Sequence, residues 1–330
     1  MQILPVIDLE AAAADSTRFE TEAQRLDRAC RDAGVFEVVG HGVPAAVIES
    51  LFAVTREFFA LPPEQKSLVA QPQPDQVRGW SGLGREGIAY SLDEESPGDL
   101  KEKMDMGPPE SLGGGPERHP GSGPHFARNV WPARPARMSV VWEEYYRHLI
   151  RVRNALLRLC AHAFALDDDF FDDKFDQSIS MLRALHYPNQ PEPPLSGQMR
   201  AGAHTDYGAF TVVTAEDRPG GLEVLRAGSW EPVPLTPGRL AVMTGDLFAE
   251  WTGDRWPSTL HRVVNPTRAQ ALDSSRLAFA FYDHPNHDVA VEPLPPFTDP
   301  DAPPGTALTS GDHLRLKYLR QTTFGRQTGG

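Results

Sequence analysis

The chain has 330 residues, enough for one large domain or two modest ones. Charged residues make up 23% and the hydrophobic set 40%, a balance typical of globular proteins and unlike that of disordered or membrane classes. With 45 acidic against 32 basic residues, the formal net charge is -13, the opposite of the basic balance expected of a nucleic-acid-binding protein.

Cysteine usage and the N-terminal segment bear on where the protein works. Cys30 and Cys160 are too few for a disulfide framework or a cysteine-based zinc site. The N-terminal MQILPVIDLE lacks the basic region and apolar core of a secretory signal. No apolar run approaches the ~18 residues that a membrane-spanning helix needs. We therefore expect a cytoplasmic protein with no membrane or nucleic-acid partner, and a monomer as the default state.

The first sixty residues mix strand and helix signals. Residues 4–9 and 35–40 are β-branched and apolar, and they predict two short strands. Residues 17–33 and 45–60 have apolar positions at helical spacing, and Gly34 is a plausible end for the first of these helices.

Two loop-like stretches follow. Residues 71–98 are polar and interrupted by glycines, and residues 107–137 include the Gly/Pro-rich GPPESLGGGPERHPGSGP. Loops of this length in a compact domain are usually functional lids or disordered segments. We therefore expect residues 70–137 to be free to cover the mouth of a site.

The second half of the chain is rich in β-strand signals. After the amphipathic helix predicted at 138–166, residues 179–293 divide into short β-rich runs between turns. These runs are MLRALHY, FTVVTAE, LEVLRAG, WEPVPL, LAVMTGD, TLHRVVN and RLAFAFYD. Such spacing favours a β-sandwich or barrel over a parallel α/β sheet. A short basic helix is expected at 311–321.

This pattern divides the chain into three parts that act as a single domain. Residues 1–178 form a helical and strand region, residues 179–300 the β core, and residues 301–330 a C-terminal helix and tail. The expected fold is therefore mainly β with flanking helices.

A candidate metal site comes from three residues of the β-rich half. His204 and Asp206 are two apart, so on an extended segment their side chains point to the same side. The pair alone is no more frequent than chance, and a turn in which Asp206 caps a neighbouring amide is the alternative. His261, on another predicted strand, adds a second imidazole. Two imidazoles and one carboxylate leave three adjacent positions open, as non-haem Fe(II) oxygenases need.

Arg276 opens the otherwise apolar run RLAFAFY. Inside a barrel, its buried cation would need an anionic partner. The guanidinium group suits a bidentate clamp on a carboxylate. The alternative is an arginine at a strand edge that reaches solvent.

Several segments together resemble a known family. HTDYGAFT (204–211), GGLEVL (220–225), GDLFAEWTGDRWPSTLHRVVNP (245–266) and RLAFAFY (276–282) are similar to the iron- and 2-oxoglutarate-dependent dioxygenases of the isopenicillin N synthase-like superfamily. The N-terminal segments LPVIDL, DAGVFEVVGHGVP and GDLKEKMDMG match as well, in the right order. The resemblance implies a distorted double-stranded β-helix (jelly roll) with an N-terminal helical layer.

The resemblance also implies roles for individual residues. His204, Asp206 and His261 would hold Fe(II), and Arg276 and Tyr187 would bind the distal carboxylate of 2-oxoglutarate. No catalytic residue beyond the metal ligands is expected. The implied reaction uses O2 and takes hydrogen from a small specialised metabolite, with hydroxylation, desaturation or ring closure as the outcome and succinate and CO2 as co-products.

The sequence departs from the family at one position. The usual Arg-x-Ser motif reads Arg276-Leu277-Ala278. The absent hydroxyl removes a hydrogen bond to a charged group worth about 1.5–3 kcal/mol. Two alternatives therefore stay open. One is an iron oxidase that works without 2-oxoglutarate, as isopenicillin N synthase or aminocyclopropane-carboxylate oxidase does. The other is a binding module without catalysis.

The substrate site is the least determined part. Arg78 falls where several relatives place an arginine for a substrate carboxylate. The other candidates are Trp80, Tyr90, Arg183 and Phe281. They suggest a small metabolite that carries a carboxylate or an amine. The histidine-rich segment 284–287 is expected to be a loop without metal, because Pro285 interrupts regular structure.

Overall fold

The computed structural model describes residues 4–73, 75–89, 96–298 and 308–327. The first half supplies most of the helices and four strands: β1 (Val6–Asp8), α1 (Leu9–Ala14), α2 (Ser16–Asp32), β2 (Val35–Val39), α3 (Ala45–Phe59), α4 (Pro63–Lys66), β3 (Gly79–Ser81), β4 (Glu102–Met106), α5 (Met138–Ala163) and α6 (Asp172–Phe175). Tyr90, one of the substrate candidates, lies outside the described residues.

The second half supplies most of the β-structure. Its elements are β5 (Met181–Tyr187), β6 (Ala201–His204), β7 (Phe210–Ala215), β8 (Leu222–Arg226), β9 (Ser229–Pro232), β10 (Leu240–Thr244), α7 (Asp246–Trp251), β11 (His261–Val263), β12 (Arg276–Tyr282) and α8 (Ser310–Gln327). The seven runs predicted from 179 to 293 each overlap one of these strands, and the extended segment expected at His204 contains β6, whereas α1, α4, α6, α7, β3 and β4 were not predicted.

The strands form two sheets. The large sheet has the order β1-β2-β10-β7-β12-β5-β4-β3, and the small sheet has the order β6-β11-β8-β9. All pairings between these strands are antiparallel except that of β1 with β2. Strands from the first 178 residues and from the β core therefore share one sheet. This architecture confirms the predicted jelly roll.

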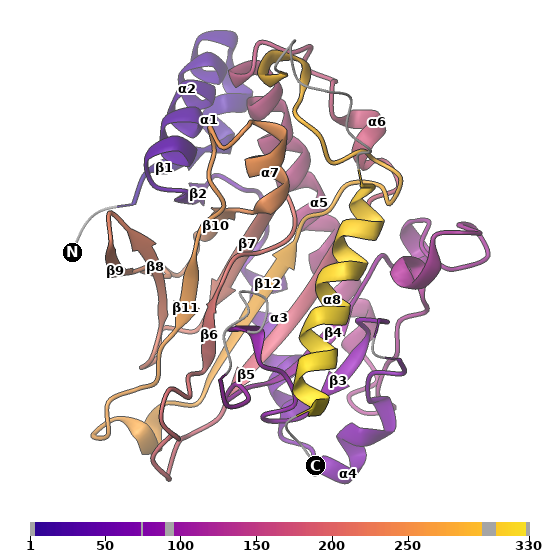
Figure 1. Cartoon of the computed structure of the whole chain (residues 1–330), viewed down its shortest axis with the longest axis vertical. Coiled ribbons are helices and arrows are strands. Elements are labelled where there is room, and N and C mark those ends of the chain that lie inside the picture. Colours follow the sequence, from indigo (N-terminus) through magenta and orange to yellow (C-terminus); the bar gives the residue numbers. More distant parts are fainter. Residues whose placement is uncertain (1–3, 74, 90–95, 299–307, 328–330) are drawn as a thin grey trace.

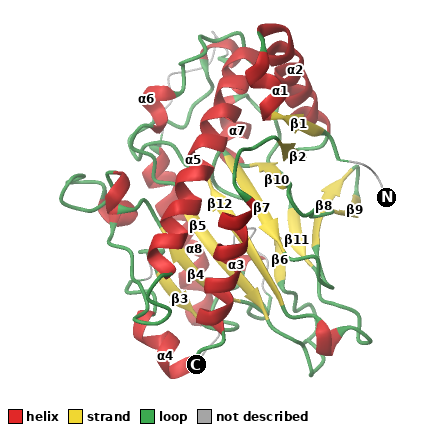
Figure 2. Ribbon diagram, turned by 180° about the vertical axis from the view of Figure 1, so that it is seen from behind, coloured by secondary structure: helices red, strands yellow, loops and turns green. Residues whose placement is uncertain are grey.

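Helices α3 and α5 cover one face of the large sheet (Figure 2). Figure 2 shows α3 and α5 lying across that face, while the small sheet and α8 lie on the other side (Figure 1). Trp142, Leu149 and Leu156 on α5 are fully buried in the core between helices and sheet. A second apolar cluster, which includes Val213, Val224 and Ala280, fills the space between the two sheets.

Strand β12 serves both of these layers, because successive side chains on a strand point to opposite faces. Its residues Leu277, Phe279 and Phe281 belong to the core against the helices. Its residues Arg276, Ala278, Ala280 and Tyr282 line the space between the sheets.

Gly34 ends α2 and ties it to the small sheet. Its φ of +65° is a conformation that favours glycine, and a Cβ here would lie 2.4 Å from the hydroxyl of Thr259. The Gly34 carbonyl accepts a hydrogen bond from that hydroxyl at 2.6 Å. The helix end therefore fixes the segment that leads into His261.

The Gly/Pro-rich segment 107–137 does not cover the space between the sheets. It contains two 3-10 turns, Glu110–Leu112 and Gly123–Phe126, and with α5 it lines a separate cavity. Of the predicted lid region 70–137, Ile88 and Lys101 line the space between the sheets. Residues 107–137 therefore contribute no lining residue to this space, whereas the broader expectation that region 70–137 covers the mouth of the site stays a prediction.

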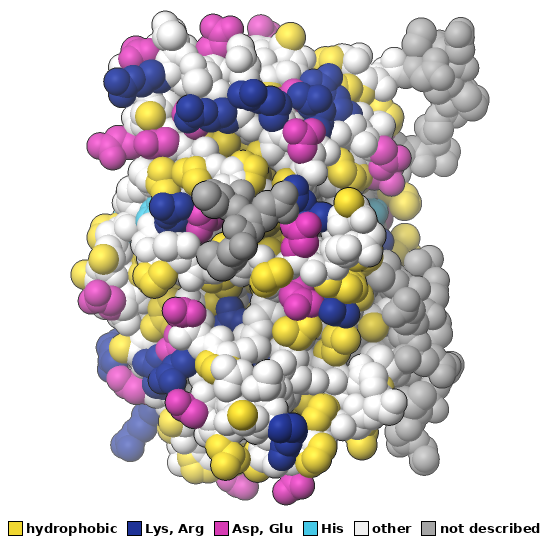
Figure 3. Space-filling view, turned by 90° about the vertical axis from the view of Figure 1, so that its left-hand side faces the viewer, with side chains coloured by type: hydrophobic (Ala, Val, Ile, Leu, Met, Phe, Trp, Pro, Cys, Tyr) yellow, Lys and Arg dark blue, Asp and Glu magenta, His cyan; other side chains and the backbone are white. Residues whose placement is uncertain are grey.

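Charges of both signs are mixed on the face that carries β8 and β9. Figure 3 shows acidic and basic side chains interspersed there, with a hollow near the middle of the face. Within the described part of the chain, no helix has the length and apolar character needed to span a bilayer.

Candidate active site

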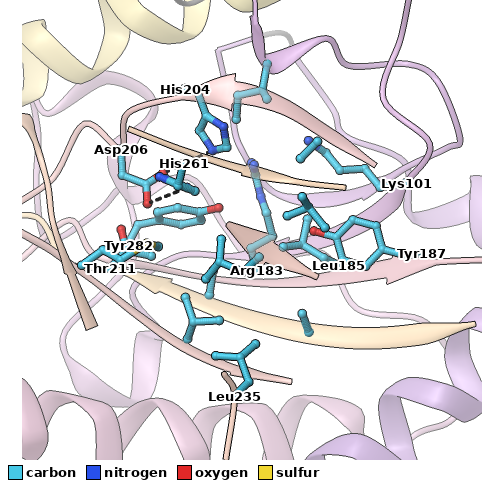
Figure 4. A pocket seen from close by; sticks show the side chains of 18 of the residues that line it. Lys101, Arg183, Leu185, Tyr187, His204, Asp206, Thr211, Leu235, His261 and Tyr282 are labelled. Atoms are coloured by element: carbon cyan, nitrogen blue, oxygen red, sulfur yellow. Dashed lines mark ion pairs between the residues drawn. The ribbon is translucent and has the colours of Figure 1, made fainter. Parts of the chain in front are cut away.

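Three potential metal ligands meet between the two sheets. His204 ends β6, His261 begins β11, and Asp206 follows β6 directly. Their ligand atoms all lie within 4.8 Å of one another, and all three side chains are buried. Each Nε2 atom lies 3.7 Å from a different carboxylate oxygen of Asp206 (Figure 4).

The backbone fixes how the two imidazoles face the cluster. The Nδ1 atom of His204 lies 2.8 Å from the Gly202 carbonyl, and that of His261 lies 3.0 Å from the Thr259 carbonyl. Each Nδ1 therefore carries the proton and donates it to a carbonyl. Each Nε2 is left as a free lone pair directed toward Asp206, which is the orientation that metal-binding histidines have.

The electrostatics of the cluster suit a divalent cation. Burial and the neighbouring His261 and Lys101 hold the pKa of His204 well below its usual value, so this imidazole is neutral. The Oδ2 atom of Asp206 is buried and has no hydrogen-bond partner among the described residues. An unpartnered carboxylate oxygen beside two imidazoles whose Nε2 atoms face it fits a metal ion with an O/N ligand set.

A pocket extends from this cluster between the sheets. Apolar side chains such as Val213, Leu222 and Met243 form most of its wall. Its charged or polar lining residues other than the three ligands are Lys101, Arg183, Tyr187, Thr211, Arg276 and Tyr282.

Arg276 and Tyr187 lie together at one end of this pocket. They are register partners on β12 and β5, and both are almost completely buried. The Arg276 guanidinium donates to the carbonyls of Glu216 and Gly220 at 3.1 and 2.7 Å. Ala278 lies two residues along the same face of β12, and its methyl side chain offers no hydrogen bond.

Comparison with protein families assigns both halves of the chain. Residues 4–134 match a family described as "non-haem dioxygenase in morphine synthesis N-terminal". Residues 178–285 match the 2OG-Fe(II) oxygenase superfamily. A proline hydroxylase of Petromyces alliaceus is 34% identical over 307 residues, which cover 87% of this chain and 91% of the relative.

The chain belongs to the 2OG-Fe(II) oxygenase superfamily.

Other relatives agree with this assignment. A validamycin A dioxygenase of Streptomyces hygroscopicus subsp. limoneus is 30% identical, with 88% of this chain and 79% of the relative covered. The crystal structure of a full-length Neurospora crassa protein in complex with alpha-KG superposes with a TM-score of 0.82 and 27% identity, over 96% of this chain and 95% of that one. The predicted family, fold, iron cofactor and 2-oxoglutarate co-substrate are confirmed at the level of the superfamily.

In this oxygenase, Arg183 lines the pocket but is already paired. Its Nε and Nη2 atoms donate to the two carboxylate oxygens of Asp105 at 2.6 and 3.3 Å, and Nη1 lies 3.7 Å from Glu86. Lys103 bridges the same two carboxylates at 3.2 and 2.8 Å. Lys101 lies 2.6 Å from Asp99 and 3.4 Å from Glu86.

The charges of this buried network cancel. Its three cations (Lys101, Lys103 and Arg183) face three carboxylates (Glu86, Asp99 and Asp105). The network therefore has no net positive charge that could pair with a substrate carboxylate.

Three other predicted substrate residues do not line the pocket. Arg78 is buried and donates to the carbonyls of Val77, His125 and Ala127, so its guanidinium is already bound within the protein. Trp80 donates to Glu102 at 2.8 Å. Phe281 packs against Tyr146 in the core on the helix side of β12, because it has the opposite parity to Arg276. We therefore assign none of the three a contact with substrate.

Three polar pocket residues were missed from the sequence, namely Lys101, Thr211 and Tyr282. Tyr282 has the same parity as Arg276 on β12, so the two-residue period could have revealed it. Its ring lies beside Asp206 (Figure 4), and the Arg183 guanidinium lies 5.4 Å from the ring centroid. Thr211 also lines the pocket, and its buried hydroxyl has no hydrogen-bond partner among the described residues.

A smaller chamber adjoins the cluster on the side of α8. It shares Ile88, Arg183, Asp206 and Tyr282 with the main pocket. Its remaining wall consists of Met181, Thr205, Tyr207, His284 and Tyr318. Because Tyr318 belongs to α8, the C-terminal helix forms part of this wall. The oxygenase thus has space on both sides of Asp206.

The histidine-rich segment 284–287 is not part of a metal group. Among the described residues, the triad is the one cluster whose side chains could hold an ion. Burial and the neighbouring His125 and His313 lower the pKa of His284 to about 3. Burial together with neighbouring cationic groups lowers the pKa of His125 to about 4. Both imidazoles are therefore neutral in the folded protein at pH 5.

This neutrality predicts a loss of stability in mild acid. In the unfolded chain both histidines take up a proton below about pH 6.5. The free energy of unfolding is therefore highest above pH 6.5. Below that pH it should fall by up to about 1.4 kcal/mol per pH unit for each histidine, until the folded pKa is reached. Asp283 opposes this trend, because burial raises the pKa of its carboxyl to about 6.

Urea unfolding at pH 7 and pH 5 measures the net effect, which we expect to be a loss. The variant His125→Gln should show a smaller difference between the two pH values, since one titrating group is gone. Equal stability of the wild-type protein at both pH values would contradict the neutral histidines.

Proposed function

We propose that His204, Asp206 and His261 bind Fe(II), and that the site oxidises a C–H bond of a small metabolite at the expense of 2-oxoglutarate. The observation that carries this proposal is the orientation of the two imidazoles. Both Nε2 atoms are held toward a buried, unpartnered carboxylate by backbone carbonyls. When bound, the iron would supply the redox chemistry with O2.

The co-substrate is proposed to lie between the iron site and the Arg276 end of the pocket. There the Arg276 guanidinium would pair with the distal carboxylate, and the Tyr187 hydroxyl would add a hydrogen bond. Burial raises the pKa of Tyr187, so the hydroxyl keeps its proton for donation. The apolar walls formed by Val213, Leu222 and Ala280 would exclude water from the bound molecule.

The metabolite is proposed to approach Asp206 from the side of the smaller chamber beside α8. This chamber reaches Asp206 from the side of Tyr207, Tyr282 and Tyr318. Curated relatives named for proline, homoarginine and validamycin A share the superfamily, so the proposed substrate class is a small metabolite. Hydroxylation, desaturation and ring closure use the same site in this proposal. A monomer remains the predicted oligomeric state.

An anaerobic titration tests the proposal directly. Addition of 2-oxoglutarate to the Fe(II)-loaded protein is expected to give a weak visible charge-transfer band, because the oxo-acid would chelate an iron held by the triad. The band should saturate at one equivalent of 2-oxoglutarate per protein. Succinate release with candidate metabolites would then measure turnover.

The same titration separates the alternatives. Iron bound without any such band would favour the oxidase that works without 2-oxoglutarate, for which Ala278 is the structural argument. A protein that binds no Fe(II) at all would contradict the triad assignment.

A further inference from the structure

Two buried arginines, not one, lie at the Tyr187 end of the pocket. Arg276 is the register partner of Tyr187. The guanidinium of Arg200 lies 5.5 Å from the centroid of the Tyr187 ring. Arg200 is completely buried, directly before β6, although it does not line the pocket itself.

Neither arginine forms an ion pair within 4.0 Å of a carboxylate among the described residues, although Asp217 lies near enough to Arg276 to raise its pKa. Arg276 donates to the carbonyls of Glu216 and Gly220. Arg200 donates to the carbonyls of Pro188, Pro219 and Ser274 and to the Ser274 hydroxyl. The Nε atom of Arg200 is buried without a partner among those residues. Buried cations of this kind are costly unless an anion compensates them, whereas the Arg183 network carries its own carboxylates.

One tight turn connects the two guanidinium groups. Arg200 Nη1 donates to Pro219 at 2.6 Å, and Arg276 Nη1 donates to the next carbonyl, that of Gly220, at 2.7 Å. Gly220 has a φ of +77°, and a Cβ there would lie 2.6 Å from Arg200 Nη1. The turn therefore admits glycine where Arg200 approaches the backbone, and it couples the position of Arg200 to that of Arg276.

Arg200 keeps its charge at neutral pH despite this environment. Burial and the nearby Arg276 lower its pKa to about 10, and burial also lowers the pKa of Arg276. The mutual repulsion of the two cations would be relieved by an anion bound beside Arg276.

We propose that Arg200 is a positioning residue for the distal carboxylate of 2-oxoglutarate. It acts through the Tyr187 ring and the 219–220 turn. Its positive charge compensates for the hydrogen bond to the carboxylate that Ala278 cannot donate. This inference rests on the proposed function, because it places the oxo-acid in the Arg276 end of the pocket. It predicts that Arg200 matters for dicarboxylic oxo-acids and not for monocarboxylic ones.

The test compares two oxo-acids that chelate the metal in the same way. In 2-oxopentanoate a methyl group replaces the distal carboxylate of 2-oxoglutarate. Binding of each to the Mn(II)-loaded protein is followed by the relaxation of water protons, which reports the displacement of metal-bound water. No turnover is needed.

The expected result is selective. Arg200→Met should weaken 2-oxoglutarate binding about tenfold, equivalent to about 1.4 kcal/mol, and leave 2-oxopentanoate binding unchanged. Arg200→Lys retains the charge and should lose less. Arg78→Lys is the matched control, since Arg78 is also buried and bonded to carbonyls but lies outside the pocket. It should change the affinity for neither oxo-acid.

Two results would overturn the role of Arg200. An equal loss for both oxo-acids would mean that Arg200 merely holds the turn, and no loss for either would mean that it does not act on the site. If Arg200→Met does not fold, Arg200→Lys decides between these results by the same comparison. A wild-type protein that does not prefer 2-oxoglutarate over 2-oxopentanoate would overturn the proposed carboxylate site itself.

Discussion

Replacing Asp206 by alanine is expected to abolish iron binding and oxygenase turnover. The substitution removes the one carboxylate of the triad, so a bound metal would have to replace that ligand with water. Loss of second-shell partners alone weakens metal sites about 10- to 100-fold, so the loss of a ligand should exceed roughly 100-fold in Fe(II) affinity. Anaerobic equilibrium dialysis against Fe(II) measures this directly.

A matched histidine pair controls this experiment. His261→Ala should match the effect of Asp206→Ala, whereas His287→Ala should leave iron binding unchanged, because His287 lies outside the triad. Wild-type iron affinity in either triad variant would refute the assignment of the ligands.

Replacing Asp105 by alanine is expected to destabilise the fold by about 3–5 kcal/mol, because it leaves a buried charge without its partner. Asp105 is 1% exposed and accepts two hydrogen bonds from Arg183. Without it, the network beside the pocket holds three cations against two carboxylates. Urea unfolding with the wild-type protein as reference measures the loss.

The double variant Asp105→Ala/Arg183→Met makes the cause of that loss visible. It restores the balance of charge, so it should be more stable than Asp105→Ala alone. A double variant less stable than the single one would mean that Arg183 stabilises the fold by packing and not through this ion pair. It would also reopen Arg183 as a group free to bind substrate.

The triad and the co-substrate end could be inferred from sequence because each depends on short-range geometry. His204 and Asp206 are two residues apart, and Arg276 opens a regular strand, so their side-chain directions follow from the strand period. The convergence of His261 with His204 is different. It depends on the antiparallel pairing of β6 with β11, which no local pattern contains. The sequence offered His261 only as a histidine on another predicted strand, and the resemblance to the family implied its role as third ligand.

The substrate side was harder to infer, because the sequence does not show which arginines are already bound to distant groups of the protein. Arg78 is a residue type that could bind a substrate carboxylate, but its guanidinium already donates to the carbonyls of His125 and Ala127. Arg183 does reach the pocket, but Asp105 on a neighbouring strand neutralises it. Phe281 could have been excluded from the sequence alone, since it is an odd number of residues from Arg276.

Because side chains alternate along β12, substitutions on one face of this strand affect packing and substitutions on the other face affect the pocket. Substitutions at Leu277, Phe279 and Phe281 would alter the packing of the helices, whereas Ala278, Ala280 and Tyr282 face the reaction space. Natural variation at the two alanines could therefore tune the co-substrate end of the pocket while the scaffold stays intact. An enzyme engineer who wants a new substrate range would start at Tyr282, because it is the one β12 residue that lines both the main pocket and the smaller chamber and it is not an iron ligand.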